Sequence, residues 1–191
     1  NGAPVGGTEV LISPASDGFN WASNGLFVFT HVTAGSAVFS DDFSSGNFSK
    51  WTGATNLTID NSKGGVAPPS ALAQTSAQTA FAFKNLGATY PSICMSVRVN
   101  AAAIDPSATT LLRLRTAGNG PITKDFTNAN GILYVRSDAS NTQLFSGVAL
   151  GSGWHTIELC GTVGVSGTWD LYRDGVKIVN AWTANTGTTQ I

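Results

Sequence analysis

Short runs in which apolar and polar residues alternate recur along the chain, and turn-forming residues separate them. A period of two is typical of strands with one buried face, whereas the helical period of 3.6 is almost absent. The pattern predicts strands at 8–12, 25–32, 37–43, 57–60, 71–74, 79–86, 92–99, 109–117, 132–138, 155–163, 168–174 and 176–182. Many antiparallel strands of this kind pack as two sheets, so the sequence predicts an all-β fold, an antiparallel two-sheet jelly-roll sandwich.

The clearest turn signal lies between the last two predicted strands. Asp174 and Gly175 supply the two positive-φ residues that a type I′ turn needs. This turn sets three expected cross-strand pairs, namely Arg173 with Val176, Tyr172 with Lys177, and Leu171 with Ile178. Tyr172 is then expected to lie along the aliphatic stem of Lys177.

The two cysteines occupy equivalent positions in two predicted strands. In both strands the apolar residues point one way, and Cys94 and Cys160 point the other way. If the strands pair with the cysteines opposite each other, Ser96 faces Glu158, and Arg98 lies one diagonal step from Glu158. This arrangement favours a disulfide formed in an oxidising compartment, and the alternative is two buried thiols. Two cysteines without clustered histidines do not form a structural zinc site.

Composition narrows the list of partners. Charged residues make up only 11% of the chain, the formal net charge is -1, and the isoelectric point is near 6.1. Such a chain has no field to attract nucleic acid or an anionic membrane surface, and it has no apolar run long enough for membrane insertion. Serine, threonine, asparagine and 22 glycines supply the polarity instead. These features predict an extracellular protein, either secreted or displayed on a surface, whose signal peptide is no longer present.

A resemblance to a known family rests on three segments, VFSDDFSSGNFSKWT, LLRLRTAGNG and GWHTIELCGTVGVSGTWDLYRDGVKIVNAW. Over residues 38–191 the chain resembles the concanavalin A-like, laminin G-like jelly-roll domains of secreted bacterial proteins. The resemblance implies two sheets around a curved core, glycan or protein binding as the usual activity, and in some members a calcium ion near the first strand. The same fold also carries glycosidases and lyases, so it does not fix the function.

The resemblance also divides the chain in two. Residues 34–191 match a jelly-roll domain without the family's usual last strand, which follows the segment matching TGTTQI. Residues 1–33 precede the domain, and their apolar run Leu26–Phe29 is of the kind that is buried on both faces of a sheet. We expect this run to complete the open sheet, either of its own chain or of a neighbour in a homo-oligomer with exchanged strands. The alternative is that the last strand was removed or lies on another chain.

Carboxylates and imidazoles give little support to catalysis. Glu9 and Glu158 are the only glutamates, and no predicted strand carries two carboxylates two residues apart, a spacing that would place a glycosidase acid/base pair on one strand face. His31 and His155 are the only histidines, and His155, at a strand start, is expected to be structural. No Gly-x-Ser-x-Gly nucleophile elbow is present. The sequence therefore leans against an enzyme.

Asp41 and Asp42 form the one adjacent carboxylate pair. Carboxylate oxygens are calcium ligands, so the pair predicts a calcium site, completed by backbone carbonyls and an acid from elsewhere in the chain. The structural alternative is that Asp42 caps a turn before Phe43 and that Asp41 pairs with a lysine or arginine.

Binding of a sugar requires an exposed aromatic ring beside polar groups that read the hydroxyls. Tyr134 and Trp182 are the aromatic residues expected at the surface, and the polar strand faces nearby carry three arginines, Arg113, Arg115 and Arg136. Each of these residues also has a structural interpretation, in packing or in ion pairs. The sequence thus favours a non-catalytic module that recognises a glycan or a protein surface. The alternative is a structural subunit of an extracellular filament or virion surface, assembled by strand complementation.

Overall fold

The computed structural model describes residues 21–23, 28–30, 37–62, 70–73, 80–101, 109–116, 120–188 and 191. Every regular element in these ranges is a strand, and none is a helix. The strands are β1 (Trp21–Ser23), β2 (Val28–Thr30), β3 (Gly53–Thr55), β4 (Leu57–Asp60), β5 (Ser70–Ala73), β6 (Phe81–Phe83), β7 (Ser92–Ala101), β8 (Thr109–Arg115), β9 (Pro121–Thr127), β10 (Ile132–Ser137), β11 (Thr142–Ala149), β12 (Trp154–Thr162), β13 (Gly167–Arg173) and β14 (Val176–Ala184). The strand predicted at 8–12 lies outside the described residues.

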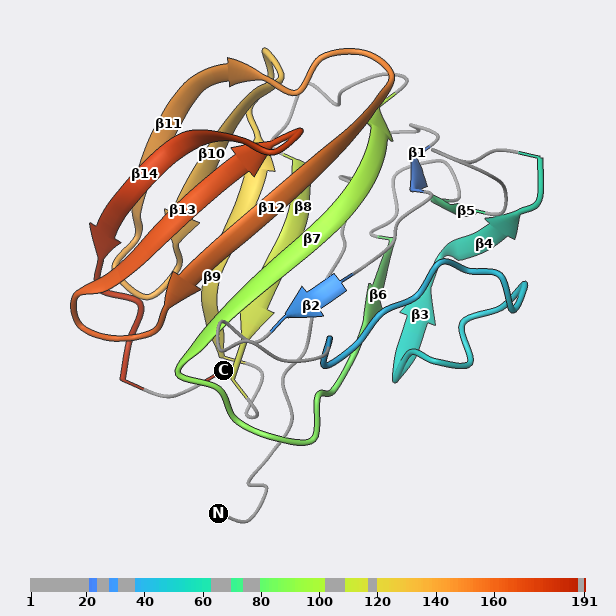
Figure 1. The fold of residues 1–191 in the computed structure, drawn as a ribbon, viewed down its shortest axis with the longest axis horizontal. Coiled ribbons are helices and arrows are strands. Elements are labelled where there is room, and N and C mark those ends of the chain that lie inside the picture. The colour runs from blue at the N-terminus through green and yellow to red at the C-terminus, as the bar shows by residue number, and fades with distance from the viewer. Residues whose placement is uncertain are drawn as a thin grey trace.

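Two large sheets pack against each other (Figure 1). The first has eight strands in the order β14-β13-β12-β7-β1-β5-β4, with β2 also paired to β7. The second has the order β11-β10-β9-β8, and β3 and β6 form a small separate ladder. All the pairings are antiparallel. The predicted all-β class and the antiparallel packed sheets are therefore confirmed.

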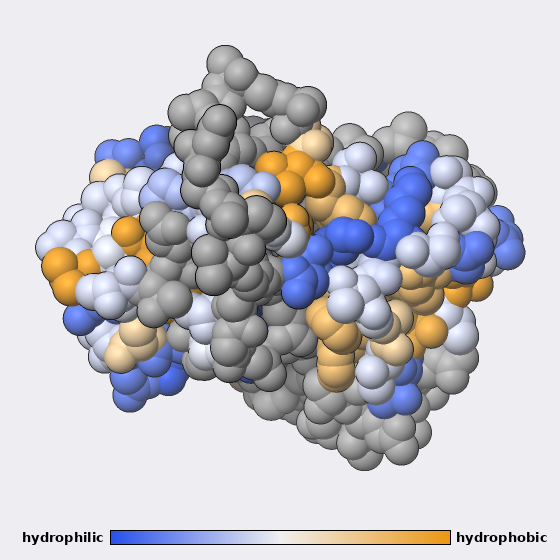
Figure 2. Space-filling model, turned by 90° about the horizontal axis from the view of Figure 1, so that it is seen from below, coloured by the Kyte–Doolittle hydropathy of each residue, from blue (hydrophilic) through white to orange (hydrophobic). Residues whose placement is uncertain are grey.

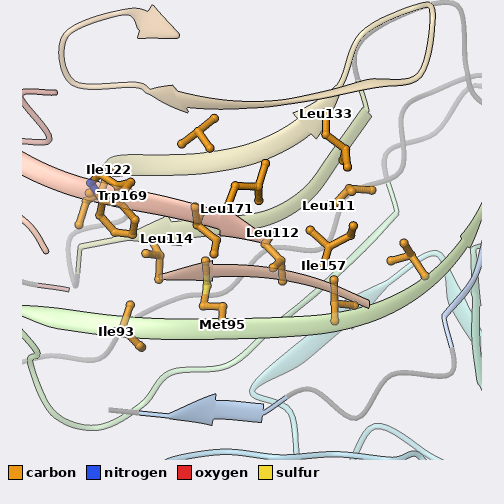
Figure 3. Close-up of a cluster of buried hydrophobic side chains, with 14 of the residues drawn as sticks. Ile93, Met95, Leu111, Leu112, Leu114, Ile122, Leu133, Ile157, Trp169 and Leu171 are labelled. Atoms are coloured by element: carbon orange, nitrogen blue, oxygen red, sulfur yellow. The ribbon is translucent and has the colours of Figure 1, made fainter. Parts of the chain in front are cut away.

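The core lies between the two large sheets and follows the predicted alternation. On β7, Ile93, Met95 and Val97 are fully buried in the core cluster. Figure 3 shows Met95 of β7 pointing toward Leu112 and Leu114 of the facing sheet. The intervening residues of β7 and β12 consequently face away from the core. They form the outer, polar face of the first sheet.

The N-terminal segment contributes to the first sheet. Val28 lies opposite Ser96, Phe29 opposite Met95, and Thr30 opposite Cys94. These pairs join β2 to β7 of the same chain, and β1 pairs with both β7 and β5. The division of the chain between residues 33 and 34 stays a prediction.

The predicted disulfide is present between Cys94 and Cys160, which are 66 residues apart in sequence and directly opposite each other on β7 and β12. Ser96 faces Glu158 as expected, and Arg98 lies opposite Thr156, one step along the ladder. A bridge that closes a loop of this length stabilises a fold by roughly 2–4 kcal/mol.

The β13–β14 hairpin has the predicted turn but a different register. Asp174 and Gly175 both have positive φ, at 52° and 78°. Tyr172 lies opposite Lys177, but Leu171 lies opposite Val179, so the predicted Leu171–Ile178 pair is wrong. Ile178 is the extra residue of a β-bulge, and the bulge directs Val179 into the core, where it is 3% exposed.

The sequence pattern also misplaced several elements. The segment 37–43, predicted as a strand, holds only an isolated bridge residue, Phe39, and leads into a turn at Phe43–Gly46, where Phe43 has a φ of 60°. The strands β1, β3, β9 and β11 were missed. The strand β9 contains Pro121, Lys124 and Asp125, residue types that are uncommon in strands. The strand β11 is largely exposed to solvent, so its apolar and polar residues do not alternate with burial.

Candidate functional site

A pocket of about 220 Å³ opens on the eight-stranded sheet, on the face that points away from the core. Its walls are Ser92, Cys160, Gly161, Thr162, Thr168, Asp170 and Ala181. The strand registers explain this grouping, because Ser92 lies opposite Thr162, and Cys160 lies opposite Asp170. Hydroxyl groups and one carboxylate therefore line a rigid surface of paired strands.

A second β-bulge, on β14, shapes one wall of the pocket. Trp169 lies opposite Trp182 and Leu171 opposite Val179, so β14 carries an extra residue between these pairs. Ala181 has a φ of 45°, and its backbone N–H donates to Asp170 Oδ1 at 2.6 Å. The Asp170 carboxylate thus holds the bulge in place.

The Asp170 carboxylate is also the charged group of the pocket. Lys177 Nζ donates to Asp170 Oδ2 at 2.8 Å, and the Tyr172 hydroxyl lies 3.4 Å from the same oxygen. Burial alone would raise the pKa of Asp170, but the hydrogen bonds from Lys177 and Ala181 outweigh it and hold the pKa below its usual value. The hydrogen bond to Asp170 raises the pKa of Lys177. Asp170 is consequently a permanent hydrogen-bond acceptor near neutral pH.

A second polar region lies on the four-stranded sheet, on the face opposite the core. Three cations converge on the Asp138 carboxylate. Arg113 Nη2 lies 2.9 Å from Oδ2, and Lys124 Nζ and Arg136 Nε each lie 3.3 Å from Oδ1. Arg136 also contacts the amides of Asn141 and Gln143. We call Arg113, Lys124, Arg136 and Asp138 the cation cluster.

An aromatic row lies beside the cation cluster. Phe126, Tyr134 and Phe145 sit directly opposite one another on β9, β10 and β11, and the ring centroids of Tyr134 and Phe145 are 4.5 Å apart. Lys124 Nζ lies 5.1 Å from the centroid of Phe126. Phe145 is 46% exposed and is the accessible ring of the row.

The structure brings together some of the residues predicted for sugar binding and separates others. Arg113 and Arg136 share the cation cluster, and Tyr134 lies beside it. Tyr134 is only 5% exposed, so the expectation of a surface ring is wrong: its two aromatic neighbours pack against it, and burial raises its pKa to about 12. Trp182 lies on the other sheet, half-buried against the core. Arg115 ends β8 opposite Pro121.

Asp170, Lys124 and Phe145 are site residues that the sequence pattern does not indicate. Lys124 and Phe145 lie on strands that the pattern did not predict, so no face was assigned to them. Asp170 was correctly placed on β13, but only the β14 bulge and the pairing with Cys160 show that it opens into a pocket.

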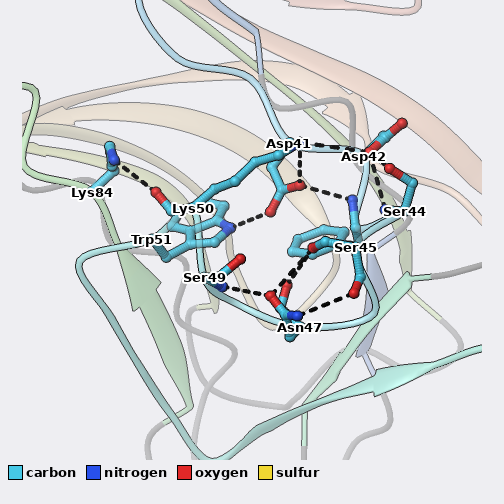
Figure 4. A network of polar contacts seen from close by, with 10 residues as sticks. Asp41, Asp42, Ser44, Ser45, Asn47, Ser49, Lys50, Trp51 and Lys84 are labelled. Atoms are coloured by element: carbon cyan, nitrogen blue, oxygen red, sulfur yellow. Dashed lines mark hydrogen bonds and ion pairs between the residues drawn. The ribbon is translucent and has the colours of Figure 1, made fainter.

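Asp41 and Asp42 organise a turn (Figure 4). The buried Asp41 carboxylate accepts from Trp51 Nε1 at 2.7 Å and from the Phe43 N–H at 3.0 Å, and Lys50 Nζ lies 3.2 Å from it. Asp42 accepts from the backbone N–H and the hydroxyl of Ser44. Hydrogen bonds to Ser44 lower the pKa of Asp42. Both carboxylates therefore make the contacts of the structural alternative. The described residues hold no cluster of three or more metal-ligating side chains.

His155 ties the hairpin tip to the preceding loop. Its Nδ1 lies 2.8 Å from Asp174 Oδ2, and its Nε2 lies 2.9 Å from the Ser152 carbonyl. Asp174 also accepts from the Thr156 N–H at 2.9 Å. These contacts give His155 the structural role expected of it.

Comparison of the chain with protein-family models, with curated proteins and with solved structures gave no match. In the described part of the chain there is no helix that is long and apolar enough to cross a membrane. On the face shown in Figure 2, the coloured hydrophobic residues form small groups among hydrophilic ones. The geometry of the pocket and of the cation cluster is therefore what bears on function.

Proposed function

We propose that this chain is a non-catalytic recognition module, with a concanavalin A-like jelly-roll fold, that binds a glycan outside the cell. The two packed antiparallel sheets and the resemblance of residues 38–191 support the fold. The Cys94–Cys160 disulfide supports an oxidising compartment.

One observation carries the proposal: the pocket on the eight-stranded sheet combines hydroxyl groups with a fixed carboxylate. Ser92, Thr162 and Thr168 can both donate and accept, and Asp170 only accepts. Sugar hydroxyls can pair with both kinds of group. The walls of the pocket include no aromatic side chain, so the polar groups, and not the aromatic ring expected from the sequence, would hold the sugar. The pocket size suits one or two sugar rings, since ligand sites begin at roughly 300 Å³ for larger molecules.

The same geometry favours binding over hydrolysis. A general acid needs a raised pKa so that it holds a proton near neutral pH. The pKa of Asp170 is shifted the opposite way, because Lys177 and Ala181 donate hydrogen bonds to its carboxylate. Asp170 therefore accepts hydrogen bonds from a ligand and does not protonate it.

A glycan array followed by calorimetry on the best ligand tests the proposal. The expected result is saturable binding to a defined sugar, reduced about tenfold or more in Thr168→Val and in Asp170→Asn, because each loses a polar contact to the sugar. Asp60→Asn, at the far strand β4 of the same sheet, is the matched control and should bind as the wild type does. The absence of binding to every glycan on the array, or equal binding by all variants, would contradict a glycan site in this pocket.

We also propose that calcium binds at the turn formed by Asp41 and Asp42. The test is the melting temperature with added calcium and with a chelator. A rise with calcium that is lost in Asp42→Asn supports a site there, whereas identical curves contradict it. The array is run under both conditions so that any effect of calcium on binding is separated from the pocket itself.

An assembly role is the second candidate, and one observation favours it. Leu144 and Phe145 are 40% and 46% exposed on β11, which in the described residues pairs only with β10. An exposed apolar edge strand is a template for pairing with another chain. Light scattering coupled to size exclusion should show oligomers that Leu144→Lys dissociates. A monomer at high concentration would exclude this candidate.

A further inference from the structure

The cation cluster on the four-stranded sheet carries more positive charge than its own residues neutralise. Arg113, Lys124 and Arg136 surround the single carboxylate of Asp138, which leaves an excess of two positive charges. The lysine ammonium and the Arg136 guanidinium both lie 3.3 Å from the same Asp138 oxygen, so the like charges are held close together. Such an arrangement is costly unless an anion relieves the repulsion.

Partial burial increases this cost. The side chains of Arg113 and Lys124 are 19% and 17% exposed, and that of Asp138 is 9% exposed. Burial lowers the pKa of Lys124; Asp138 opposes this effect, and Arg113 and Arg136 lower the pKa further. Arg113 Nε is buried and has no hydrogen-bond partner among the described residues. The cluster therefore holds an unsatisfied buried donor as well as excess charge, and an anion would reach it through the partly exposed ends of the Arg113 and Lys124 side chains.

The surroundings of the cluster identify the kind of anion. Arg136 lies beside the amide groups of Asn141 and Gln143, which are exposed and can pair with hydroxyl groups. Phe145 presents an exposed ring at the other end of the aromatic row. An aromatic ring takes the apolar face of a sugar, and guanidinium groups take carboxylates or sulfates.

We propose that the cation cluster is a second binding site, separate from the pocket, for the carboxylate or sulfate group of an acidic polysaccharide. The anion lies against Arg113 and Lys124. Phe145 lies two strands beyond Lys124, roughly 10 Å away at about 4.8 Å per strand, so a different ring of the same polysaccharide packs on Phe145. The overall charge of -1 makes this a local attraction that does not extend over the whole surface. The proposal rests on the cluster alone and does not depend on the pocket.

Calorimetry with polygalacturonate, and with the same polymer fully methyl-esterified, tests the proposal, because the two differ only in the ionised carboxylates. The acidic polymer should bind about tenfold or more tightly than its ester, and its affinity should fall with added salt. Dextran sulfate in a parallel titration distinguishes sulfate from carboxylate ligands. Poly-L-glutamate that binds as tightly as polygalacturonate would overturn the assignment to a polysaccharide.

Two substitutions with opposite expected signs separate binding from folding. Lys124→Gln removes a cation and should weaken binding of polygalacturonate about tenfold, whereas Asp138→Asn removes the competing carboxylate and should strengthen it. Lys84→Gln, which removes a lysine that contacts Phe39 and the Lys50 carbonyl, is the charge-matched control and should bind normally.

Near-UV circular dichroism verifies that each variant is folded, and Arg136→Gln replaces Lys124→Gln if the latter does not fold. Equal affinity for the acidic and esterified polymers would overturn the proposal. So would unchanged binding in both cluster variants. Asp170→Asn should bind polygalacturonate as the wild type does, so failure of the pocket and failure of the cluster are distinguishable.

Discussion

The carboxyl group of Asp125 accepts a hydrogen bond from the backbone N–H of Leu112, 2.9 Å away, at a bulge between β8 and β9. Both residues are fully buried, and Asp125 faces the core between Leu112 and Val135. Burial raises the pKa of Asp125 to about 8, although the Leu112 N–H acts in the opposite direction. The protein thus holds a neutral carboxyl group in its core near neutral pH.

This relationship predicts a pH dependence of stability. In the unfolded chain Asp125 loses its proton near its usual pKa of about 4, whereas the folded chain keeps it until about pH 8. The stabilisation is therefore complete below about pH 4 and is lost as the pH rises to about 8, at a rate of up to about 1.4 kcal/mol per pH unit. Urea denaturation at about pH 5 and about pH 9 should show a smaller loss for Asp125→Asn than for the wild type. Parallel losses in the two proteins would contradict the neutral carboxyl group.

Gly161 has no room for a side chain. A Cβ there would overlap the ring of Trp169, which lies directly opposite on β13 and is fully buried. Gly161→Ala should lower the free energy of unfolding by about 2 kcal/mol, because the ring cannot move in a packed core. At Gly164 a Cβ would meet nothing closer than 3.8 Å, so Gly164→Ala is the matched control. Equal free energies of unfolding for the two variants, measured by chemical denaturation, would contradict this prediction, because they would mean that the Trp169 ring moves to make room for the added methyl group.

The Asp41 carboxylate stabilises the turn that precedes β3. Asp41→Ala leaves Trp51 Nε1 and the Phe43 N–H without their acceptor in a buried site. The expected loss is about 2–4 kcal/mol, since two hydrogen bonds to a charged group are removed together. Asp42→Ala, whose side chain is 57% exposed, should cost less than about 1 kcal/mol. The melting temperatures of the two variants give the comparison, and a larger shift for Asp42→Ala would contradict this ranking.

The Cys94–Cys160 bridge joins the central strands of the first sheet. Replacing both cysteines by serine should lower the free energy of unfolding by roughly 2–4 kcal/mol. A reducing agent should produce the same change in the wild type and none in the double variant. Denaturation curves that do not respond to the reducing agent would mean that the bridge contributes nothing to stability.

The alternation of residues predicted much of the fold. It placed Ile93, Met95 and Val97 inside and Cys94 outside, and the parity of Cys160 then predicted the bridge. The Asp174–Gly175 turn was equally predictable, because only a few residue types adopt two consecutive positive φ angles. These features depend on local geometry, which the order of residues specifies directly.

The candidate sites depended on contacts that no local pattern encodes. The bulges on β14 moved Val179 into the core and Ala181 against Asp170, and the ladder β8-β9-β10 brought Arg113, Lys124 and Arg136 to one carboxylate. Tyr134 became buried because Phe126 and Phe145 arrived from neighbouring strands.

The sequence by itself determined the all-β class, which residues of β7 and β12 face the core, and the Cys94–Cys160 disulfide. These features follow from the period of two, which backbone geometry imposes on a strand. Only the tertiary structure decided which side chains share a pocket or a charge cluster, because strand order and bulges bring together residues that are distant along the chain.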